Sequence, residues 1–382
     1  MERIYLDYAA TTPVRKEVYE EMKDFFDRAY GNPSSIHTMG QEARTRLEYC
    51  RQKLAESIGC GPDEVFFTSG GTESDNMAIK GTAFANRKRG RHIITSVIEH
   101  HAVLNPCQWL EKNGFEVTYV PVDRYGMVNP DDIEKSMRKD TILVSVMHAN
   151  NEIGTIEPIE QIGKLCQSRE VYFHTDAVQS LGKVPIRLEN VDMASFSSHK
   201  IYGPKGAGAL YIRKGTIIEP LLHGGGQECE MRSGTENVTG IVGFSKAAEL
   251  ITEEMQEESR RLKTLRDRLI SGVLGIEKSH LNGHPESRLP NNANFWFDYI
   301  EGESLLLSLD DKGIEASTGS ACSSRSLEPS HVLMAIGLKH EQAHGSLRLT
   351  LGKYTKEGDI DYVLQTLPDV IEKLRNISPF KK

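Results

Sequence analysis

The sequence predicts an α/β protein with a large, mostly parallel mixed sheet of seven strands and a smaller α+β unit. Between residues 65 and 177, short runs rich in β-branched and aromatic residues alternate with segments of helical periodicity. This alternation is typical of βαβ units and of a mostly parallel sheet. Two further runs, 193–199 and 208–213, have no helix between them, which indicates a hairpin and therefore a mixed sheet.

The expected elements follow in chain order. The seven strands are residues 65–69, 92–97, 116–122, 141–148, 171–177, 193–199 and 208–213. Helical spacing of apolar residues predicts helices over 76–88, 104–112 and 159–168. The segment 238–274, rich in Glu, Lys, Arg and Leu, predicts a long helix that leaves the large unit and crosses to a second one.

A second unit follows from length and from the elements after this helix. A chain of 382 residues is too long for one small core. Strands at 292–297, 315–318 and 346–351 and helices at 301–313 and 356–376 form the smaller α+β unit. We expect a large unit over residues 14–257 and a small one made of residues 1–13 and 258–382.

Composition limits the class of protein. The chain is 38% hydrophobic and 26% charged, as expected for a globular fold. The net charge of -8 argues against broad binding to nucleic acids or anionic membranes. No apolar run approaches the roughly 18 residues of a membrane helix, and the N-terminus lacks the pattern of a secretory signal. Six cysteines without a C-x-x-C pair favour neither a zinc site nor a disulfide framework, so a reducing, cytoplasmic setting is expected.

Polar groups follow five of the predicted strands, where open α/β sheets bind ligands. They are a Gly- and Thr-rich nest at 69–74, the imidazole of His100, the amide of Asn151, the carboxylate of Asp176 and the amine of Lys200. One polar strand end is ordinary, but this set at one sheet edge fits a cofactor site.

The nest SGGTES opens a helix. Gly71 lets the backbone approach a ligand, and first-turn N–H groups attract a phosphate. The alternative is a plain turn capped by Thr72. Asp176 ends an apolar strand, where a carboxylate can hold a pyridine nitrogen protonated; alternatively it caps the next turn.

Lys200 stands in SSHKIYGPKGAGAL, where small residues and glycines leave room for a bulky ring. A partly buried lysine can lose its proton and form an imine. A solvated lysine in a Gly-rich hairpin is the alternative, and the nest and Asp176 weigh against it. His100 is a candidate for stacking on a ring or relaying protons, or else a helix-capping or core histidine.

Two candidates lie near the C-terminus. Cys322 sits in a Gly/Ser/Ala loop, where an exposed thiol suits a nucleophile better than a packing role. Arg348 alternates with leucines in SLRLTL, so it points away from their apolar face. Its planar fork suits a substrate carboxylate; alternatively it is a solvated arginine on an edge strand.

Long motifs carry a resemblance that runs nearly end to end. They are YLDYAATTP (5–13), GNPSSIH (31–37), TSGGTESDN (68–76), ITSVIEHHAVL (94–104), MHANNEIGT (147–155), HTDAVQSLGK (174–183), SSHKIYGPKG (197–206), MRSGTEN (231–237), GSACSSRSLEPS (319–330) and LRLTLGKYT (347–355). In these motifs the chain resembles the pyridoxal-phosphate-dependent cysteine desulfurases of the NifS/IscS kind, in the class V aminotransferase group. The resemblance implies the fold type I of pyridoxal-phosphate-dependent transferases.

The resemblance also implies a role for each matching residue. Lys200 forms the imine with pyridoxal phosphate, Asp176 pairs with the ring nitrogen, and Gln179 pairs with the ring hydroxyl. The residues implied to contact the phosphate are Gly71, Thr72, Ser197, His199 and, donated by the other subunit of a homodimer, Thr235. His100 stacks on the ring and takes part in catalysis, Asn151 lies near ring and substrate, Arg348 anchors the substrate carboxylate, and Cys322 accepts the sulfur.

The implied reaction converts L-cysteine to L-alanine and leaves a persulfide on Cys322. The sulfur then passes to an acceptor, such as an iron–sulfur scaffold or a protein of tRNA or cofactor thiolation. No resident metal is expected, and Cys322 is the candidate for transient ligation of a cluster. The C-terminus LRNISPFKK does not carry the tail with which related enzymes dock a scaffold, which leaves the partner open.

Other functions remain as alternatives at this point. Selenocysteine lyase, cysteine-sulfinate desulfination and a true aminotransferase use the same scaffold, although an aminotransferase has no use for Cys322. A non-catalytic sulfur carrier would not need the intact lysine, aspartate and histidine. A dinucleotide-binding enzyme is disfavoured because no G-x-G-x-x-G follows the first strand of the alternating region.

Overall fold

The computed structural model describes residues 3–318 and 328–378. Its largest sheet has seven strands in the order β2-β8-β7-β6-β5-β3-β4. The bounds are β2 (Val65–Thr68), β3 (His92–Ser96), β4 (Glu116–Val120), β5 (Thr141–Ser145), β6 (Tyr172–Asp176), β7 (Met193–Ser197) and β8 (Gly208–Ile212). Strand β8 runs antiparallel to both β2 and β7, and the other pairs are parallel. The predicted mixed sheet and its hairpin are confirmed.

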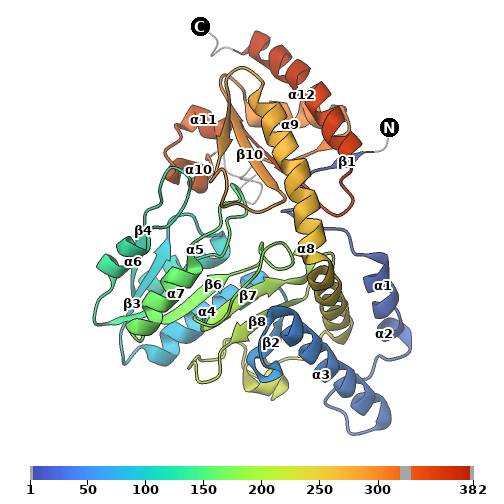
Figure 1. Ribbon diagram of the computed structural model, residues 1–382. Coiled ribbons are helices and arrows are strands. Elements are labelled where there is room, and N and C mark those ends of the chain that lie inside the picture. Colours follow the sequence, from blue (N-terminus) through green and yellow to red (C-terminus); the bar gives the residue numbers. More distant parts are fainter. Residues whose placement is uncertain (1–2, 319–327, 379–382) are drawn as a thin grey trace.

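Helices cover both faces of this sheet (Figure 1). Strands β3, β5, β7 and β8 are buried at every residue, as expected for strands covered on both sides. On one face lie α3 (Thr38–Ile58), α7 (Ile159–Ser168) and the first half of α8 (Val238–Leu274), and on the other lie α4 (Gly71–Asn86) and α5 (His101–Glu111). The short α6 (Pro130–Ser136) packs beside α7.

The helices α4 and α5 start earlier than the apolar periodicity predicted. Helix α4 begins at Gly71, not at residue 76, and α5 begins at His101, not at residue 104. Their first turns contain polar residues such as Thr72 and His101, which line a cavity. Apolar periodicity reports only the turns that pack against apolar neighbours. The true starts were indicated instead by the motif SGGTES for α4 and by the helix-capping alternative for His100 in α5.

The second unit lies above the first in Figure 1. It contains an antiparallel sheet of β9 (Ser279–Asn282), β10 (Asn292–Phe297) and β12 (Ser346–Thr350), and a parallel pair of β1 (Ile4–Tyr5) and β11 (Ile314–Glu315). Its helices are α9 (Gly302–Asp311), α10 (His331–Ala335), α11 (His340–His344) and α12 (Glu357–Ile377).

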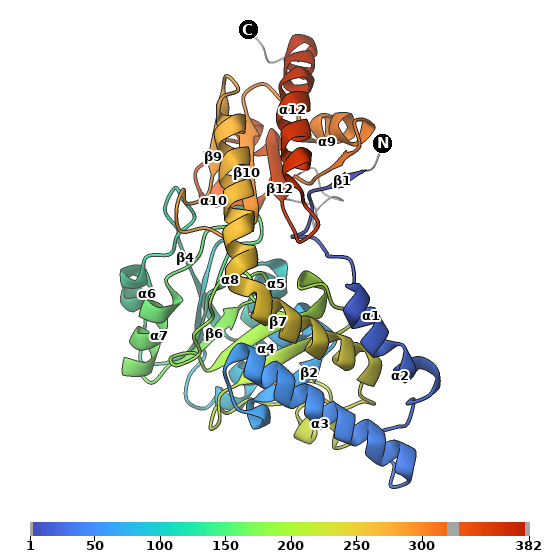
Figure 2. The ribbon, with the colours of Figure 1, turned by 45° about the vertical axis from the view of Figure 1, so that its right-hand side comes forward.

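The two units are joined by chain segments far apart in the sequence. Helix α8 runs unbroken from the lower unit to the upper one (Figures 1 and 2). The N-terminal segment pairs through β1 with β11 and buries Leu6 in the upper core, while α1 (Lys16–Met22) and α2 (Asp24–Asp27) lie on the lower unit. The boundaries at residues 13 and 257 stay a prediction, and α8 passes through the second without a break.

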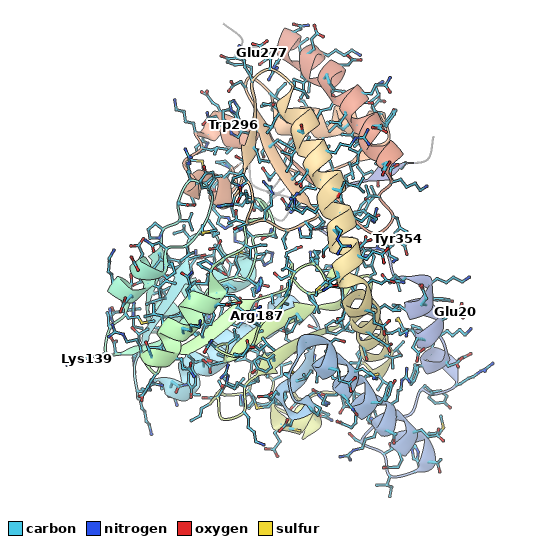
Figure 3. All side chains as sticks on the ribbon, in the orientation of Figure 1. Glu20, Lys139, Arg187, Glu277, Trp296 and Tyr354 are labelled. Carbon is cyan, nitrogen blue, oxygen red and sulfur yellow. The ribbon has the colours of Figure 1, made fainter. Side chains whose placement is uncertain are left out.

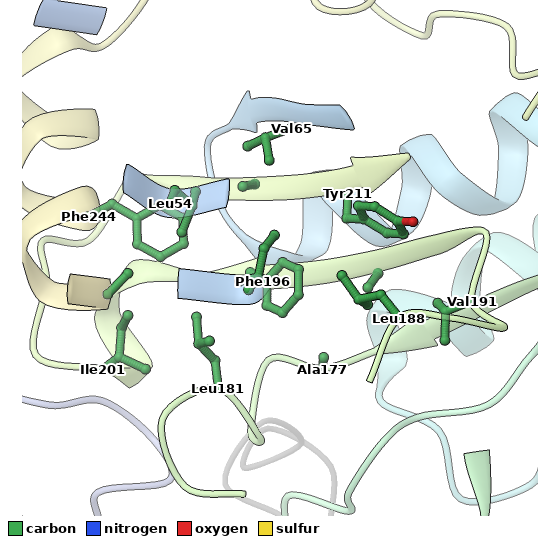
Figure 4. Close-up of a cluster of buried hydrophobic side chains, with 14 of the residues drawn as sticks. Leu54, Val65, Ala177, Leu181, Leu188, Val191, Phe196, Ile201, Tyr211 and Phe244 are labelled. Carbon is green, nitrogen blue, oxygen red and sulfur yellow. The ribbon is translucent and has the colours of Figure 1, made fainter. Parts of the chain in front are cut away.

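Apolar side chains lie in the core and charged side chains lie mostly at the surface, because burial favours the first and costs free energy for the second. Glu20 and Lys139 lie at the periphery in Figure 3, and both are exposed, as is Arg187. Figure 4 shows Phe196 of β7 inside one face's core, near Leu181 and Ile201. Among residues 3–318 and 328–378, no helix is long and apolar enough to cross a membrane.

We expect Phe196→Ala to lower the free energy of unfolding by about 3–5 kcal/mol, because it leaves a cavity in a rigid core. Phe196 is fully buried, whereas Phe26 on α2 is 67% exposed and provides the matched control. Denaturant titration of both variants would measure the difference. Equal losses for Phe196→Ala and Phe26→Ala would contradict the assigned packing.

Candidate cofactor site

A cavity of about 300 Å³ lies where the carboxyl ends of the large sheet meet the second unit. Most residues predicted from the sequence share this one cavity. Those lining it are Gly71, Thr72, His100, Asn151, Asp176, Gln179, Ser197, His199, Lys200 and Arg348. Thr235 does not line it and is exposed on this chain, and Cys322 lies outside the described residues.

The amine of Lys200 is held by the N-terminal segment. Lys200 follows β7 in a short 3-10 turn, and its Nζ donates hydrogen bonds to the main-chain oxygens of Ala9 and Ala10, each at 2.7 Å. Gln179 Nε2 donates to the same Ala9 oxygen at 3.0 Å. The run YLDYAATTP therefore forms part of the site, which sequence reasoning had recognised only as a motif.

Asp176 ends β6 with a buried carboxyl group. Its Oδ1 accepts a hydrogen bond from the Val178 N–H at 2.9 Å. Burial raises the pKa of Asp176 to about 6, against the opposing effects of the Val178 hydrogen bond and the charge of Lys200. The carboxyl group is therefore ionised at neutral pH, as pairing with a protonated ring nitrogen requires.

The start of α4 offers a place for a phosphate. The first N–H groups of a helix have no partner within it and lie at its positive end. Gly71 is needed there, because a Cβ would come within 2.6 Å of Val178 Cγ2. Ser197 and His199 line the same cavity; His199 Nδ1 lies 3.1 Å from Thr11 Oγ1, and burial lowers the pKa of His199 to about 4.

His100 combines the two roles that the sequence left open. Its Nδ1 accepts a hydrogen bond from the Ala102 N–H at 3.1 Å, so it caps α5 while its ring lines the cavity. Burial, aided by the charge of Lys200, lowers the pKa of His100 to about 4. The ring is therefore neutral, with its remaining proton on Nε2.

Arg348 is buried, so the alternative of a solvated arginine is wrong. Only 3% of it is exposed, while Leu347 and Leu349 beside it belong to the apolar core of the second unit. Its Nη1 donates to the Asn151 main-chain oxygen at 3.0 Å and its Nη2 to Asp7 Oδ1 at 2.8 Å. Its buried Nε has no partner among the described residues, which leaves a donor for a ligand carboxylate.

Further polar residues of the cavity were missed from the sequence. Glu99 Oε1 accepts from Ser96 Oγ at 2.5 Å and from the Met147 N–H at 3.0 Å, and burial raises the pKa of Glu99 to about 8. Glu152 Oε2 accepts from Ser330 Oγ at 2.5 Å, and burial raises its pKa to about 7. In the sequence, Glu99 precedes His100 and Glu152 follows Asn151. This adjacency to predicted site residues was the signal that could have identified them.

Three comparisons place the chain among known proteins. The family model "Aminotransferase class-V" matches residues 4–363. The protein named "Cysteine desulfurase IscS" of Dictyoglomus turgidum is 61% identical over 99% of this chain and 97% of its own length. The protein of the same name from Methanosarcina thermophila is 60% identical over 98% of this chain and 94% of its own. The chain belongs to the class-V aminotransferase family.

Solved structures agree with the fold of this family member. A "NIFS-LIKE PROTEIN" superposes with a TM-score of 0.92 at 44% identity, covering 97% of this chain and all of that one. A structure described as "SspA in complex with cysteine" gives a TM-score of 0.83 at 37% identity, covering 92% of this chain and all of that one. The fold is therefore the type I fold of pyridoxal-phosphate-dependent enzymes.

The residues present fit pyridoxal phosphate, the cofactor of this family. Lys200 offers an amine, Asp176 a carboxylate for the ring nitrogen, and the start of α4 a phosphate site, all on one cavity. The cavity volume lies at the lower end of the usual range for ligand pockets, about 300–1,000 Å³. No cluster of three or more metal-ligating side chains occurs within residues 3–318 and 328–378.

We expect Glu99→Gln to stabilise the cofactor-free protein at pH 8 but hardly at pH 5. The pKa of Glu99 is about 8 in the folded protein, above its usual 4.5, so the native state binds the extra proton. Stability of the wild type therefore falls as pH rises from about 5 to 8, whereas a neutral amide carries no such cost. Denaturant titration at both pH values measures the difference in free energy of unfolding between the variant and the wild type. A difference that is equal at pH 5 and pH 8 would contradict the burial of an ionisable carboxyl group.

Proposed function

We propose that the chain is a pyridoxal-phosphate-dependent cysteine desulfurase, which converts L-cysteine to L-alanine and takes up the sulfur as a persulfide on Cys322. The observation that carries this proposal is that Lys200, Asp176 and Arg348 line one cavity. An amine, a buried carboxylate and a guanidinium with a spare N–H match the cofactor and the carboxylate of an amino acid. The names of the relatives, including the structure in complex with cysteine, support the choice of substrate.

The residues divide the work of binding the substrate. The guanidinium of Arg348, already oriented by Asp7 and Asn151, holds the carboxylate of L-cysteine. Lys200 places its amine beside the substrate Cα, where it removes and returns a proton as general base and acid. The neutral His100 ring lines the cavity and would pack against the bound cofactor. The cofactor, when bound, supplies an electron sink for the charge left at Cα.

The sulfur transfer balances without an external oxidant. The Cys322 thiol and L-cysteine become a persulfide and L-alanine: an S–S bond forms, the Cβ–S bond of the substrate breaks, and Cβ gains a proton. On either side of segment 319–327, a described residue lies in the cavity wall or pairs with a residue that does. Ser317 pairs with Arg348 in a β-bridge, and Ser330 lines the cavity wall.

The assembly and the destination of the sulfur are part of the same proposal. Thr235 is exposed on this chain and away from its own cavity, as a residue donated to a partner subunit's phosphate site would be. We therefore propose a homodimer with shared sites. The acceptor is a second protein, such as an iron–sulfur scaffold. The described cysteines 50, 60, 107, 166 and 229 are all free thiols, which supports a reducing, cytoplasmic location.

The deciding experiment measures L-alanine released from L-cysteine by the purified protein loaded with pyridoxal phosphate. We expect catalytic alanine, with sulfide appearing when a reducing thiol such as dithiothreitol is present. The reductant is needed because the persulfide must be discharged before the next turnover. Cofactor-loaded protein that releases no alanine would overturn the assigned substrate, and L-selenocysteine and L-cysteine sulfinate would be tested next.

We expect Lys200→Ala to lose the visible absorbance of the cofactor after dialysis, because the amine that forms the imine is gone. Lys205→Ala, five residues along in an exposed turn, is the matched control and should keep it. An absorption spectrum decides the matter. Retention of the band by the Lys200 variant would mean that another amine carries the cofactor.

We expect Cys322→Ser to bind the cofactor normally and to form no persulfide, since a hydroxyl cannot accept sulfane sulfur. Mass spectrometry of the protein after one addition of L-cysteine reports the added sulfur atom. Cys229→Ser removes an exposed thiol remote from the cavity and should leave the persulfide in place. Full alanine production by the Cys322 variant would show that this thiol is not the sulfur acceptor.

A further inference from the structure

His331 lines the cavity, although no role was assigned to it from the sequence. It is the first residue of α10, and its Nε2 lies 2.9 Å from the main-chain oxygen of Glu99. A carbonyl oxygen accepts hydrogen bonds and cannot donate them, so Nε2 carries the ring proton. In a neutral imidazole the other nitrogen, Nδ1, is then a hydrogen-bond acceptor.

This acceptor is neutral and open. Burial, and secondarily the neighbouring His101, lower the pKa of His331, whereas the Glu99 carbonyl opposes them, so the ring is uncharged at pH 7. Its titratable neighbours are His101, whose ring centre is 5.0 Å away, and Glu99. No group within residues 3–318 and 328–378 makes a hydrogen bond to Nδ1. His331, a residue that lines the cavity, therefore has an acceptor nitrogen without a hydrogen bond among these residues.

The ring is fixed before any ligand arrives. The preceding Ser330 donates to Glu152 Oε2 at 2.5 Å, and its Oγ also caps α10 by accepting from the Leu333 N–H at 3.3 Å. Val332 and Leu333 pack in an apolar cluster with Ile98. The residues before and after His331 are thus held in place by hydrogen bonds and by apolar packing. Orienting Nδ1 therefore costs little conformational entropy when a ligand binds.

The position of His331 points to the side chain of a bound amino acid. Arg348 Nη1 donates to the main-chain oxygen of Asn151, and the next residue, Glu152, accepts a hydrogen bond from Ser330. His331, which follows Ser330, therefore lies at the Arg348 end of the cavity. An amino acid held by its carboxylate at Arg348 and by its amino group near Lys200 turns its third substituent to the remaining wall. Two imidazoles, those of His101 and His331, line the cavity on that side.

We propose that His331 is a specificity-determining residue whose Nδ1 accepts a hydrogen bond from the thiol of the bound L-cysteine. This inference rests on the proposed function and names the group that recognises its substrate. The bond holds the proton on the substrate sulfur, and no covalent bond breaks. A protonated sulfur is the better target for an attacking thiolate, because two thiolates would repel each other.

The test compares L-cysteine with L-2-aminobutyrate, in which a methyl group replaces the thiol. Cys322→Ser provides a background that binds L-cysteine without turning it over, so Kd is read from the change in cofactor absorbance. We expect His331→Leu to raise the Kd of L-cysteine about three- to tenfold, which corresponds to the net value of one hydrogen bond. The Kd of L-2-aminobutyrate should rise less than about twofold. His340→Leu, at an exposed histidine on α11, is the matched control and should change neither Kd.

Equal weakening of both ligands would show a structural role for His331, and unchanged binding of L-cysteine would show no role; either result overturns the inference. His331→Phe, which keeps the shape of a ring without its nitrogens, gives the same comparison if the leucine variant does not fold. Wild-type protein that releases no alanine from L-cysteine would overturn the proposed function instead. An active wild type whose selectivity is unchanged in both variants would overturn the role of His331 alone.

Discussion

The parallel pairing of β6 with β7 is the constraint on which the cavity depends, because it brings Asp176 and Lys200 to the same edge of the sheet. Burial pushes the Asp176 carboxyl group towards its neutral form, and the charge of Lys200 opposes that tendency. The pair exists because two strands of the sheet, β6 and β7, end side by side. A parallel arrangement brings both carboxyl ends to the same edge, which an antiparallel pair would not do.

Burial shifts the other carboxyl groups beside Lys200 and Asp176 towards their neutral form. Glu99 and Glu152 both have raised pKa values, and each accepts a hydrogen bond from a serine hydroxyl. Few cations face them, so ionisation of every carboxyl group would place several like charges in one low-dielectric wall. Because the pKa of Asp176 is about 6, below those of Glu99 and Glu152, Asp176 is the most ionised of the three carboxyl groups at neutral pH. The cost is stability that declines as pH rises.

The two units of the chain contribute different chemistry to the cavity. The large sheet supplies the lysine, the aspartate and the start of α4, which together suit a phosphorylated ring. The second unit supplies Arg348 and His331, which suit the two ends of a small amino acid. The N-terminal segment contributes the carbonyl oxygens of Ala9 and Ala10, which accept hydrogen bonds from Lys200. These two residues lie near the start of the sequence, whereas Arg348 lies near its end. The composition of the cavity thus depends on how the two units pack.

The sequence by itself determined the strands, the long helix and the chemical inventory of the site. Apolar strand runs and the residues at their ends are local features, and the motifs around Lys200 and Asp176 were long enough to indicate the family.

The tertiary structure alone decided which polar groups meet. The polar first turns of α4 and α5 have no apolar periodicity, so their starts were indicated only by the motif SGGTES and by the capping alternative for His100. The pairing of Arg348 with Asp7, the tie of His331 to the Glu99 carbonyl and the burial of Glu99 join residues distant in sequence or depend on packing. Hydrogen bonds and desolvation act through space, and a linear pattern does not contain those distances.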